Sequence, residues 1–395
     1  MTDLAETARP ARSSALNDPK LRAFAYQALL VIAVLFLVIS AGGEAVSNMR
    51  QRGIPLTFDF WNQVSGFDIN QTLIPYTNQS TYGQAFWVGL CNTLLVAALG
   101  IVLATVIGFA VGIARLSHNW IVVSLASVYV EVLRNIPPLL VLLFIYNAVL
   151  KPLPNPKQSI ALPGSIFLNN RGIIMPDPVF GAGSGLVALA LVAGLLLSVA
   201  MARWARLRQT QTGKQFPILT VGLALTFGLP LLAYLVMGRP ITFNVPVLKG
   251  FNFQGGRQIY PELAALLFGL SVYTASFIAE IVRAGIQSVH RGQSEAAHAL
   301  GLPHGRTTCL VVVPQAMRVI IPPLTSEYLN LAKNSSLAVF IGYPDLVQVF
   351  SGTVLNQTGA AVQVMAITMA VYLTISLVTS FAMNLFNKRN ALVER

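Results

Sequence analysis

The sequence predicts an all-α polytopic membrane protein with about eight transmembrane helices. Hydrophobic residues make up 55% of the 395-residue chain and charged residues only 10%, with a mean hydropathy of +0.66. A typical soluble domain carries about 25% charged residues. The chain also contains long apolar stretches, and a helix needs roughly 20 such residues to cross a bilayer. The net charge of +12 is therefore better explained by membrane topology than by nucleic-acid binding.

Eight stretches have the length and composition of transmembrane helices. The first is expected to be a retained span rather than a signal peptide, because its polar leading tail is long and residues 40–45 lack an A-x-A cleavage site. Six prolines argue against helix in the loop 151–182. The seventh stretch is polar enough for a hydropathy window to miss it. The expected spans are about 23–41, 85–114, 121–150, 183–202, 216–237, 262–286, 319–342 and 361–386.

Lysine and arginine predict the orientation. Eight spans put both termini on one side of the membrane, and the segments on that side carry 16 Lys and Arg residues against 8 in the opposite loops. Loops rich in Lys and Arg favour the cytoplasm. Both termini, and the stretch between the sixth and seventh spans, are therefore expected to be cytoplasmic.

That cytoplasmic stretch contains the most specific spacing in the chain. It has Glu-Ala-Ala at 295–297, then Gly301, then Val-Val-Val-Pro at 311–314. Ser294 can cap a short helix, Gly301 can end it in the left-handed conformation, and Pro303 can occupy the first turn of a second helix. Two short helices joined by a glycine bend would form a rigid knob that fits a groove in a soluble partner. The alternative is an ordinary loop between spans.

This spacing resembles the EAA loop of ABC-importer permeases, with valines where isoleucine and leucine are usual. Other segments are similar to the polar amino-acid permeases of these importers, and the resemblance covers about 85–150 and 262–386. The extra first span and two inserted spans make the layout look most like the general amino-acid permease subunits. The segments that carry the resemblance are 129–140, 279–286, 292–293, 314–315 and 331–337.

The resemblance implies a set of partners and a domain organisation. Such a permease lies in the bacterial inner membrane, pairs with a second homologous permease and two copies of a cytoplasmic ABC ATPase, and receives its substrate from a periplasmic amino-acid-binding protein. The implied units are a cytoplasmic tail (1–23), an extra span and periplasmic loop (24–84), a type I permease domain (85–386) with a five-helix core, an insertion (about 151–261) and a coupling loop (about 289–314), and a second cytoplasmic tail (387–395).

Charged residues within the spans are candidates for the substrate pathway, since such residues are costly in a bilayer. Arg134 precedes Pro137 and Pro138, where a broken helix can turn a cation toward a cavity. The alternative, a snorkelling interfacial arginine, fits its mid-span position less well. Glu280 and Arg283 stand three apart on one helical face, so an ion pair that fixes the helix end is at least as good an explanation as substrate contact.

Lys333 is the strongest candidate for contact with an α-carboxylate. Asn330, Lys333 and Asn334 share a helical face, and Ser335 and Ser336 follow. A buried cation among amides and hydroxyls can receive a carboxylate. The residues assigned to the substrate pathway are Arg134, Asn135, Pro137, Glu280, Arg283, Asn330, Lys333, Asn334, Ser335 and Ser336. By the resemblance, those assigned to ATPase coupling are Gly292, Gln293, Glu295, Ala296, Ala297, Gly301 and Pro314.

Motifs for independent catalysis are absent from the sequence. It has no G-x-x-x-x-G-K-[ST] phosphate loop, no G-x-S-x-G elbow and no H-E-x-x-H pair. The chain is therefore expected not to hydrolyse ATP itself, and no cofactor, metal site or nucleic-acid partner is predicted. The competing function is an ion-driven secondary transporter, which usually shows two repeated halves that are not evident here. A membrane scaffold would leave Arg134 and Lys333 without a role.

Overall fold

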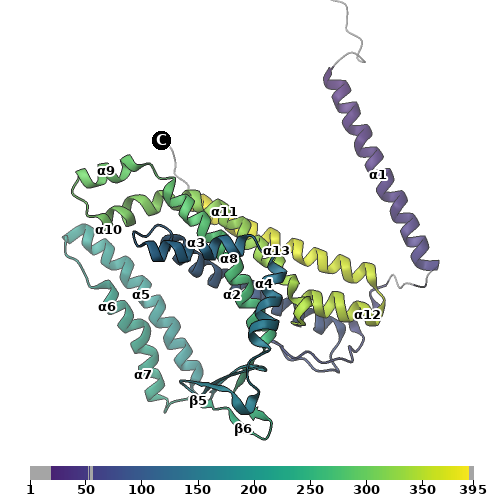
Figure 1. Ribbon diagram of the computed structural model, residues 1–395, viewed down its shortest axis with the longest axis horizontal. Coiled ribbons are helices and arrows are strands. Elements are labelled where there is room, and N and C mark those ends of the chain that lie inside the picture. The colour runs from purple at the N-terminus through teal and green to yellow at the C-terminus, as the bar shows by residue number, and fades with distance from the viewer. Residues whose placement is uncertain (1–18, 52, 54–56, 391–395) are drawn as a thin grey trace, which may run out of the picture.

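The computed structural model describes residues 19–51, 53 and 57–390. The chain is mainly helical, as predicted (Figure 1). In the described residues seven helices are long and apolar enough to cross a membrane, or eight if the bent pair 120–150 is one span. The helices that match the predicted spans are α1 (Pro19–Gln51), α2 (Tyr82–Ala114), α3 (Trp120–Arg134) with α4 (Pro138–Phe144), α5 (Ser184–Thr212), α6 (Ile218–Leu223) with α7 (Leu229–Val236), α8 (Pro261–Gln287), α11 (Val313–Asn334) and α13 (Ala361–Asn390).

The predicted tails fall mostly outside the described residues, which exclude 1–18 and 391–395. The first span is longer than predicted, because α1 already begins at Pro19 and continues to Gln51. Its polar start and end are helical as well, since few residues there oppose a helix. Figure 1 draws α1 apart from the other helices.

Helices α2 and α8 form the centre of the bundle, and glycines allow their close contact. A Cβ at Gly108 would lie 2.6 Å from the Cβ of Ile278, and one at Gly112 would lie 2.8 Å from the carbonyl oxygen of Ala279. Helix association in a bilayer depends on such close packing of small residues. Helix α8 meets α11 in the same way, because Gly285 lies against Ile320.

We expect Gly112→Val to destabilise the bundle, because the added side chain would overlap Ala279 and Val282. Overpacking of this kind costs roughly 1–3 kcal/mol. Heating the detergent-solubilised protein and measuring the remaining monodisperse fraction by size exclusion checks this expectation. Gly185→Val is the matched control, because a Cβ at Gly185 would have nothing within 4 Å. Equal losses in both variants would show that the effect is not due to packing between helices.

The third span is broken in the middle, as the two prolines predicted. Helix α3 ends at Arg134 and α4 starts at Pro138, with an angle of 109° between the two segments. Pro137 has extended backbone angles, φ −57° and ψ 140°, as expected for a residue that precedes proline. The break places Arg134 at the C-terminal end of α3, where its side chain is partly exposed.

The segment after α1 folds back over the end of the bundle opposite α9. Thr81 and Gln84 form a reciprocal capping box at the start of α2, which ends the preceding loop at a defined residue. The ring of Phe60 packs 6.4 Å from those of Tyr82 and Phe350, measured between centroids. The segment that follows α11 lies in the same region and consists of short helices. These are η7 (Ser335–Ile341), η8 (Val347–Val354) and α12 (Leu355–Thr358).

Residues 151–261 contain a helical hairpin and three small antiparallel sheets. In the hairpin, a Cβ at Gly194 of α5 would lie 2.4 Å from the carbonyl oxygen of Leu225. Ser198 lies 3.0 Å from the hydroxyl of Thr226, and its hydroxyl donates to the carbonyl of Gly222. The connecting segment between α6 and α7 is η5 (Ala224–Gly228). Close contact and shared hydrogen bonds therefore hold α5 against helices α6 and α7, which form the second arm of the hairpin.

After η3 (Ile145–Leu150), residues 151–182 form no α-helix, as predicted, and contain only the short 3₁₀ helix η4 (Pro156–Gln158). The strands in this segment were not predicted. The largest sheet has the order β1-β2-β3-β8, and the others pair β4 with β5 and β6 with β7. Runs of apolar residues around Asn169-Asn170-Arg171-Gly172 are a hairpin signal that could have been recognised. The strands are β1 (Ile160–Leu162), β2 (Ile166–Asn169), β3 (Gly172–Met175), β4 (Asp177–Phe180), β5 (Ile241–Asn244), β6 (Val247–Lys249), β7 (Asn252–Gln254) and β8 (Arg257–Ile259).

The sheets and the short helices α9 (Arg291–Ala299) and α10 (His304–Thr307) lie at opposite ends of the helical bundle (Figure 1). Strand β8 leads directly into α8, and α8 leads toward α9 at its other end. One long helix thus joins the two regions in which partners are expected.

Candidate functional site

Glu280 is the centre of a charged cluster inside the bundle. Arg283, one turn further along α8, donates from Nε to Oε2 at 3.3 Å and from Nη2 to Oε1. Arg115, which caps the end of α2, donates from Nη1 to Oε2. The predicted local pair of Glu280 with Arg283 is confirmed. Arg115 was missed as a site residue, although a carboxylate within a span requires a partner and Arg115 ends a neighbouring span.

Arg134 is the third arginine of this cluster and the most exposed. Its Nη1 lies 3.9 Å from Oε2 of Glu280, and its side chain is 41% exposed against 12% for Arg115. Its guanidinium lies over the ring of Phe277 at 5.4 Å from the centroid. Arg115 and Arg283 therefore satisfy Glu280, while Arg134 keeps much of its hydrogen-bonding capacity.

A cavity of about 440 Å³ opens beside Arg134. Two arginines, Arg115 and Arg134, and two glutamates, Glu131 and Glu280, line this cavity, so its formal charges balance. Asn135 also lines it, but its Nδ2 donates to the carbonyl of Glu131 at 2.7 Å. Pro137 is not among the lining residues, and its effect is to break the helix. The lining residues are Arg115, Val130, Glu131, Arg134, Asn135, Phe277 and Glu280.

Glu327 brings a second carboxylate near Arg134 and was not predicted. It is half-buried on α11 and lies close enough to Arg134 for a Coulombic interaction. Glu327, Asn330 and Asn334 follow the i, i+3, i+7 spacing of one helical stripe. The sequence signal was available, because a glutamate in a polar but membrane-spanning helix is costly without a partner.

The expectation that Lys333 is buried is wrong for the single chain. Lys333 and Asn330 are exposed, Asn334 and Ser336 are half-buried, and only Ser335 is buried. The hydroxyls of Ser335 and Ser336 donate to the backbone of their own helix, to Ala332 and Lys333. These residues do share a helical region, but they do not line the cavity at Arg134.

The stretch between the sixth and seventh spans begins with a capped helix whose start differs from the prediction. Helix α9 begins at Arg291, and Nδ1 of its N-cap residue His290 accepts a hydrogen bond from the backbone nitrogen of Gly292 at 3.1 Å. The expectation that Ser294 is the cap is wrong, because Ser294 lies inside the helix. Glu295 is consequently one turn away from the helix N-terminus, where the dipole is weaker.

Gly301 ends helix α9 as predicted, with φ of +80°. Its backbone nitrogen donates to the carbonyl of His298 at 2.9 Å, and Leu302 donates to Ala297 at 3.1 Å. This pair of bonds is a Schellman motif. Glycine is favoured there because other residues meet a steric penalty in the left-handed region.

The second short helix is continuous with the seventh span, which corrects the predicted separate helix. Pro303 precedes α10 as its N-cap, and α10 runs through η6 (Thr308–Val312) into α11. Pro314 is tolerated near the start of α11, since the wide turn before it accommodates the missing N–H. Gln315 donates to Gln293 at 3.3 Å, which ties α11 to α9.

Helix α9 has an exposed side. Glu295 and Ala296 are exposed and Leu300 is 83% exposed, whereas Ala297 is buried. An exposed carboxylate, a small residue and a large apolar residue on a rigid helix can be received by a groove in a partner. In the described part of the chain, no three His, Cys, Asp or Glu side chains are grouped so that they could hold a metal ion.

Comparisons with known proteins identify the family of the chain. Residues 210–391 match the family described as the inner membrane component of binding-protein-dependent transport systems. The chain is 51% identical over 382 residues to the general L-amino acid transport system permease protein AapQ of Rhizobium johnstonii, covering 97% of this chain and 95% of the relative.

Two further relatives cover the chain as completely. It is 51% identical to the putative amino-acid ABC transporter permease protein YhdX of Escherichia coli, over 97% of this chain and 98% of that protein. It is 40% identical to the glutamate/glutamine/aspartate/asparagine transport system permease protein BztB of Rhodobacter capsulatus, over 97% of both. The chain therefore belongs to the permease family of binding-protein-dependent ABC importers, among the amino-acid permeases.

Proposed function

We propose that this chain is one of two permease subunits of an importer that moves L-amino acids, with polar and acidic ones among them, into the cytoplasm. The chain is a multi-pass transport component, and in its family the ATPase is a separate subunit. The names of the relatives AapQ and BztB support this substrate class. An ion-driven secondary transporter is not favoured, because membership of the ABC permease family assigns the energy source to ATP.

The observation that carries the proposed pathway is the partly exposed, loosely paired guanidinium of Arg134 at the break between α3 and α4. Arg134 borders the cavity and is only loosely paired with Glu280. Its guanidinium is suited to bind the α-carboxylate that all amino acids share, through two parallel hydrogen bonds. Glu327 can interact with the α-ammonium group of the same molecule. In this proposal Arg115 and Arg283 hold Glu280 in place and position Arg134.

The exposed face of α11 is proposed to line the pathway from the side of a second permease. Asn330 and Lys333 are exposed in the single chain, and a cation at membrane depth is stable only against a partner or a water-filled path. A homologous subunit placed against this face would enclose Lys333. Asn334, Ser335 and Ser336 would then follow along the same path.

Helix α9 and the bend at Gly301 are proposed to contact one of two ATPase subunits. The exposed residues Glu295, Ala296 and Leu300 would enter a groove of the ATPase, and the Schellman bend fixes the direction of α9 relative to the seventh span. Movement of the ATPase would thereby be passed to the helices around the cavity. Gly292, Gln293, Ala297 and Pro314 support this contact by shaping α9 and its attachment to α11.

The proposed orientation places α9 and both termini in the cytoplasm and the sheets on the periplasmic side. The bias of Lys and Arg toward one set of segments supports it. Residues 151–261 are then an insertion in a five-helix core, and its outer part is available to a periplasmic binding protein. The extra helix α1 precedes this core.

Purification of the complex from membranes tests the proposal. A tagged chain is expected to bring down one homologous permease and an ATPase, and the reconstituted complex should hydrolyse ATP faster when binding protein loaded with L-amino acids is added. A panel of L-amino acids would define the substrate range. Purification of the chain without any ATPase would contradict the proposed coupling.

We expect Lys333→Met to lower the rate of amino-acid uptake while the complex still assembles, because methionine keeps much of the apolar stem but not the charge. Uptake of radiolabelled amino acid into proteoliposomes measures the effect. Lys388→Met, at the end of α13, is the control for loss of one positive charge. Uptake that is unchanged by Lys333→Met would assign Lys333 to packing.

A further inference from the structure

The two outer segments of residues 151–261 form one subdomain. Strand β3, from the first segment, pairs with β8, from the second, with Ile173 opposite Ile259. The rings of Phe167 and Phe253 lie 4.6 Å apart between centroids, and Lys157 lies over the ring of Phe251 at 4.1 Å. We call this unit, residues 151–181 and 239–260, the outer subdomain.

The outer subdomain is continuous with helix α8 of the core. Gly172 approaches the end of β8 so closely that a Cβ would lie 2.0 Å from the carbonyl oxygen of Ile259. Two residues later the chain enters α8 at Pro261, and α8 carries Glu280 of the charged cluster. The outer subdomain therefore lies next to the start of the helix that carries Glu280.

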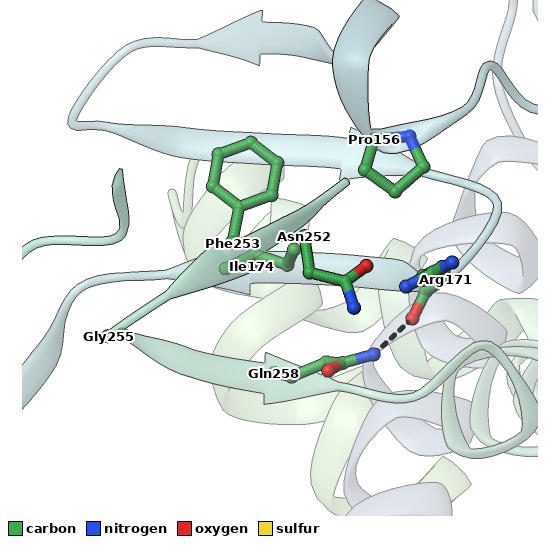
Figure 2. A pocket seen from close by; sticks show the side chains of 8 residues that line it. Pro156, Arg171, Ile174, Asn252, Phe253, Gly255 and Gln258 are labelled. Carbon is green, nitrogen blue, oxygen red and sulfur yellow. Dashed lines mark hydrogen bonds between the residues drawn. The ribbon is translucent and has the colours of Figure 1, made fainter. Parts of the chain in front are cut away.

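A cavity of about 310 Å³ lies between the two halves of this subdomain. Figure 2 shows the guanidinium of Arg171 and the side-chain amides of Asn252 and Gln258 gathered at it, with Phe253 and Pro156 on the side away from Gln258. Gln258 donates to the backbone carbonyl of Arg171 at 2.7 Å, which fixes the turn that presents Arg171. The cavity thus combines N–H donors with an apolar wall.

Charge in the subdomain is strongly one-sided. It contains six Lys and Arg residues and one acidic residue, Asp177. Asp177 forms an ion pair with Arg257 at 2.9 Å, so no carboxylate of this subdomain is left for Arg171. Within the described residues, the guanidinium of Arg171 has no ion-pair partner. An arginine in this setting is suited to bind a carboxylate through two parallel hydrogen bonds.

We propose that this cavity receives an aspartate or glutamate side chain of the periplasmic binding protein and so positions that protein on the permease. The proposal rests on the proposed function, and it adds the site and the chemistry of docking. A protein partner rather than a free amino acid is the assigned source, because positive charge extends over the subdomain beyond the cavity, at the exposed residues Lys151 and Lys157. A surface of this kind speeds and orients association with an acidic surface.

The test uses the complete complex in nanodiscs and the amino-acid-loaded binding protein, with ATP hydrolysis as the readout. Deleting the segment 155–175 would remove β1, β2 and β3 completely, so single side chains are changed instead. Arg171→Gln is expected to raise the concentration of binding protein that gives half-maximal stimulation by about ten-fold or more, since a charge-assisted bond is lost. Arg171→Lys should give a smaller increase, because it keeps the charge but not the planar fork. Asn252→Ala should shift the value in the same direction.

Lys249→Gln is the matched control, because Lys249 is exposed on the same subdomain but does not line the cavity. The inference is overturned if Arg171→Gln and Lys249→Gln raise the half-maximal concentration equally, or if Arg171→Gln leaves it unchanged. Both outcomes leave the proposed function standing, because binding protein still stimulates the complex. Absence of stimulation in the parental complex would instead contradict the proposed function.

A second arm distinguishes the source of the carboxylate. Free L-glutamate is titrated into the complex without binding protein, and its binding is followed by calorimetry. No binding at millimolar glutamate, together with the shift in Arg171→Gln, supports a docking site for a protein side chain. Binding of free glutamate that is lost in Arg171→Gln would overturn the docking assignment in favour of a site for free amino acids.

Discussion

Gly301→Val is expected to abolish amino-acid uptake while normal amounts of the permease remain in the membrane. Gly301 has φ of +80° and a Cβ there would meet nothing within 4 Å, so the obstacle is the backbone conformation rather than space. A β-branched residue in the left-handed region costs about 1–2 kcal/mol or more. The bend would change its angle to avoid this cost, and the two bonds of the Schellman motif would be lost. Helix α9 would then meet the ATPase in the wrong direction.

The measurement compares uptake into proteoliposomes with ATPase bound to the purified complex. Loss of uptake, either with loss of the ATPase or with futile ATP hydrolysis, is the expected result. Gly305→Val is the matched control, because Gly305 is also unobstructed but lies in α10 without a positive φ. Gly301→Asn should keep much of the activity, since asparagine adopts the left-handed conformation more readily.

Glu295→Lys tests the face of α9 separately from the bend. Glu295 is exposed and lies inside the helix, so the change should leave the helix intact and reverse a contact charge. Reduced ATPase binding is expected, and higher ionic strength should lessen the difference between variant and parent. If Gly301→Val and Glu295→Lys both transport at the parental rate with the ATPase bound, the stretch is a connecting loop.

Arg134→Gln is expected to reduce uptake by about 10- to 100-fold, because charge-assisted hydrogen bonds to a carboxylate are worth roughly 1.5–3 kcal/mol. The loss should fall on substrate recognition, since Arg115 and Arg283 still hold Glu280. Arg134→Lys should retain part of the activity, because lysine keeps the charge but lacks the fork. Initial rates of uptake over a range of concentrations of loaded binding protein measure the effect.

Two controls separate recognition from structure. Arg206→Gln removes an exposed arginine from α5 and should leave uptake unchanged. Decarboxylated analogues of the substrates, loaded onto the binding protein where it accepts them, should be transported poorly by the parent, and Arg134→Gln should reduce this discrimination. A variant that loses amines and amino acids equally would show that Arg134 acts on the structure of the bundle.

Local backbone conformation was predicted from the sequence wherever a single residue type restricts it. Pro137 and Pro138 predicted the break in the third span, and Gly301 predicted the left-handed end of α9. The cap of α9 was predicted wrongly, because His290 and Ser294 can both cap a helix and the choice depends on where the preceding span ends. The strands of the outer subdomain were missed because three- and four-residue strands, paired across about 80 residues between β3 and β8, leave little periodic signal.

In the candidate site, too, some contacts were predictable from the sequence and others were not. Glu280 with Arg283 was predictable, since residues three apart on a helix face each other. Arg115 and Arg134 reach the same carboxylate from other helices, and Lys333 turns away from them to an exposed face. No spacing along the chain contains that information, because it depends on how α2, α3 and α11 rotate as they pack around α8.

By itself, the sequence determined a membrane protein of about eight spans, its family and the glycine bend at Gly301, since composition, length and single-residue backbone preferences act locally. Only the tertiary structure decided which charges meet. Three arginines share Glu280, Glu327 lies near Arg134, and Arg171 stands without an ion-pair partner among the described residues, because glycine contacts between helices and pairing between distant strands set those distances.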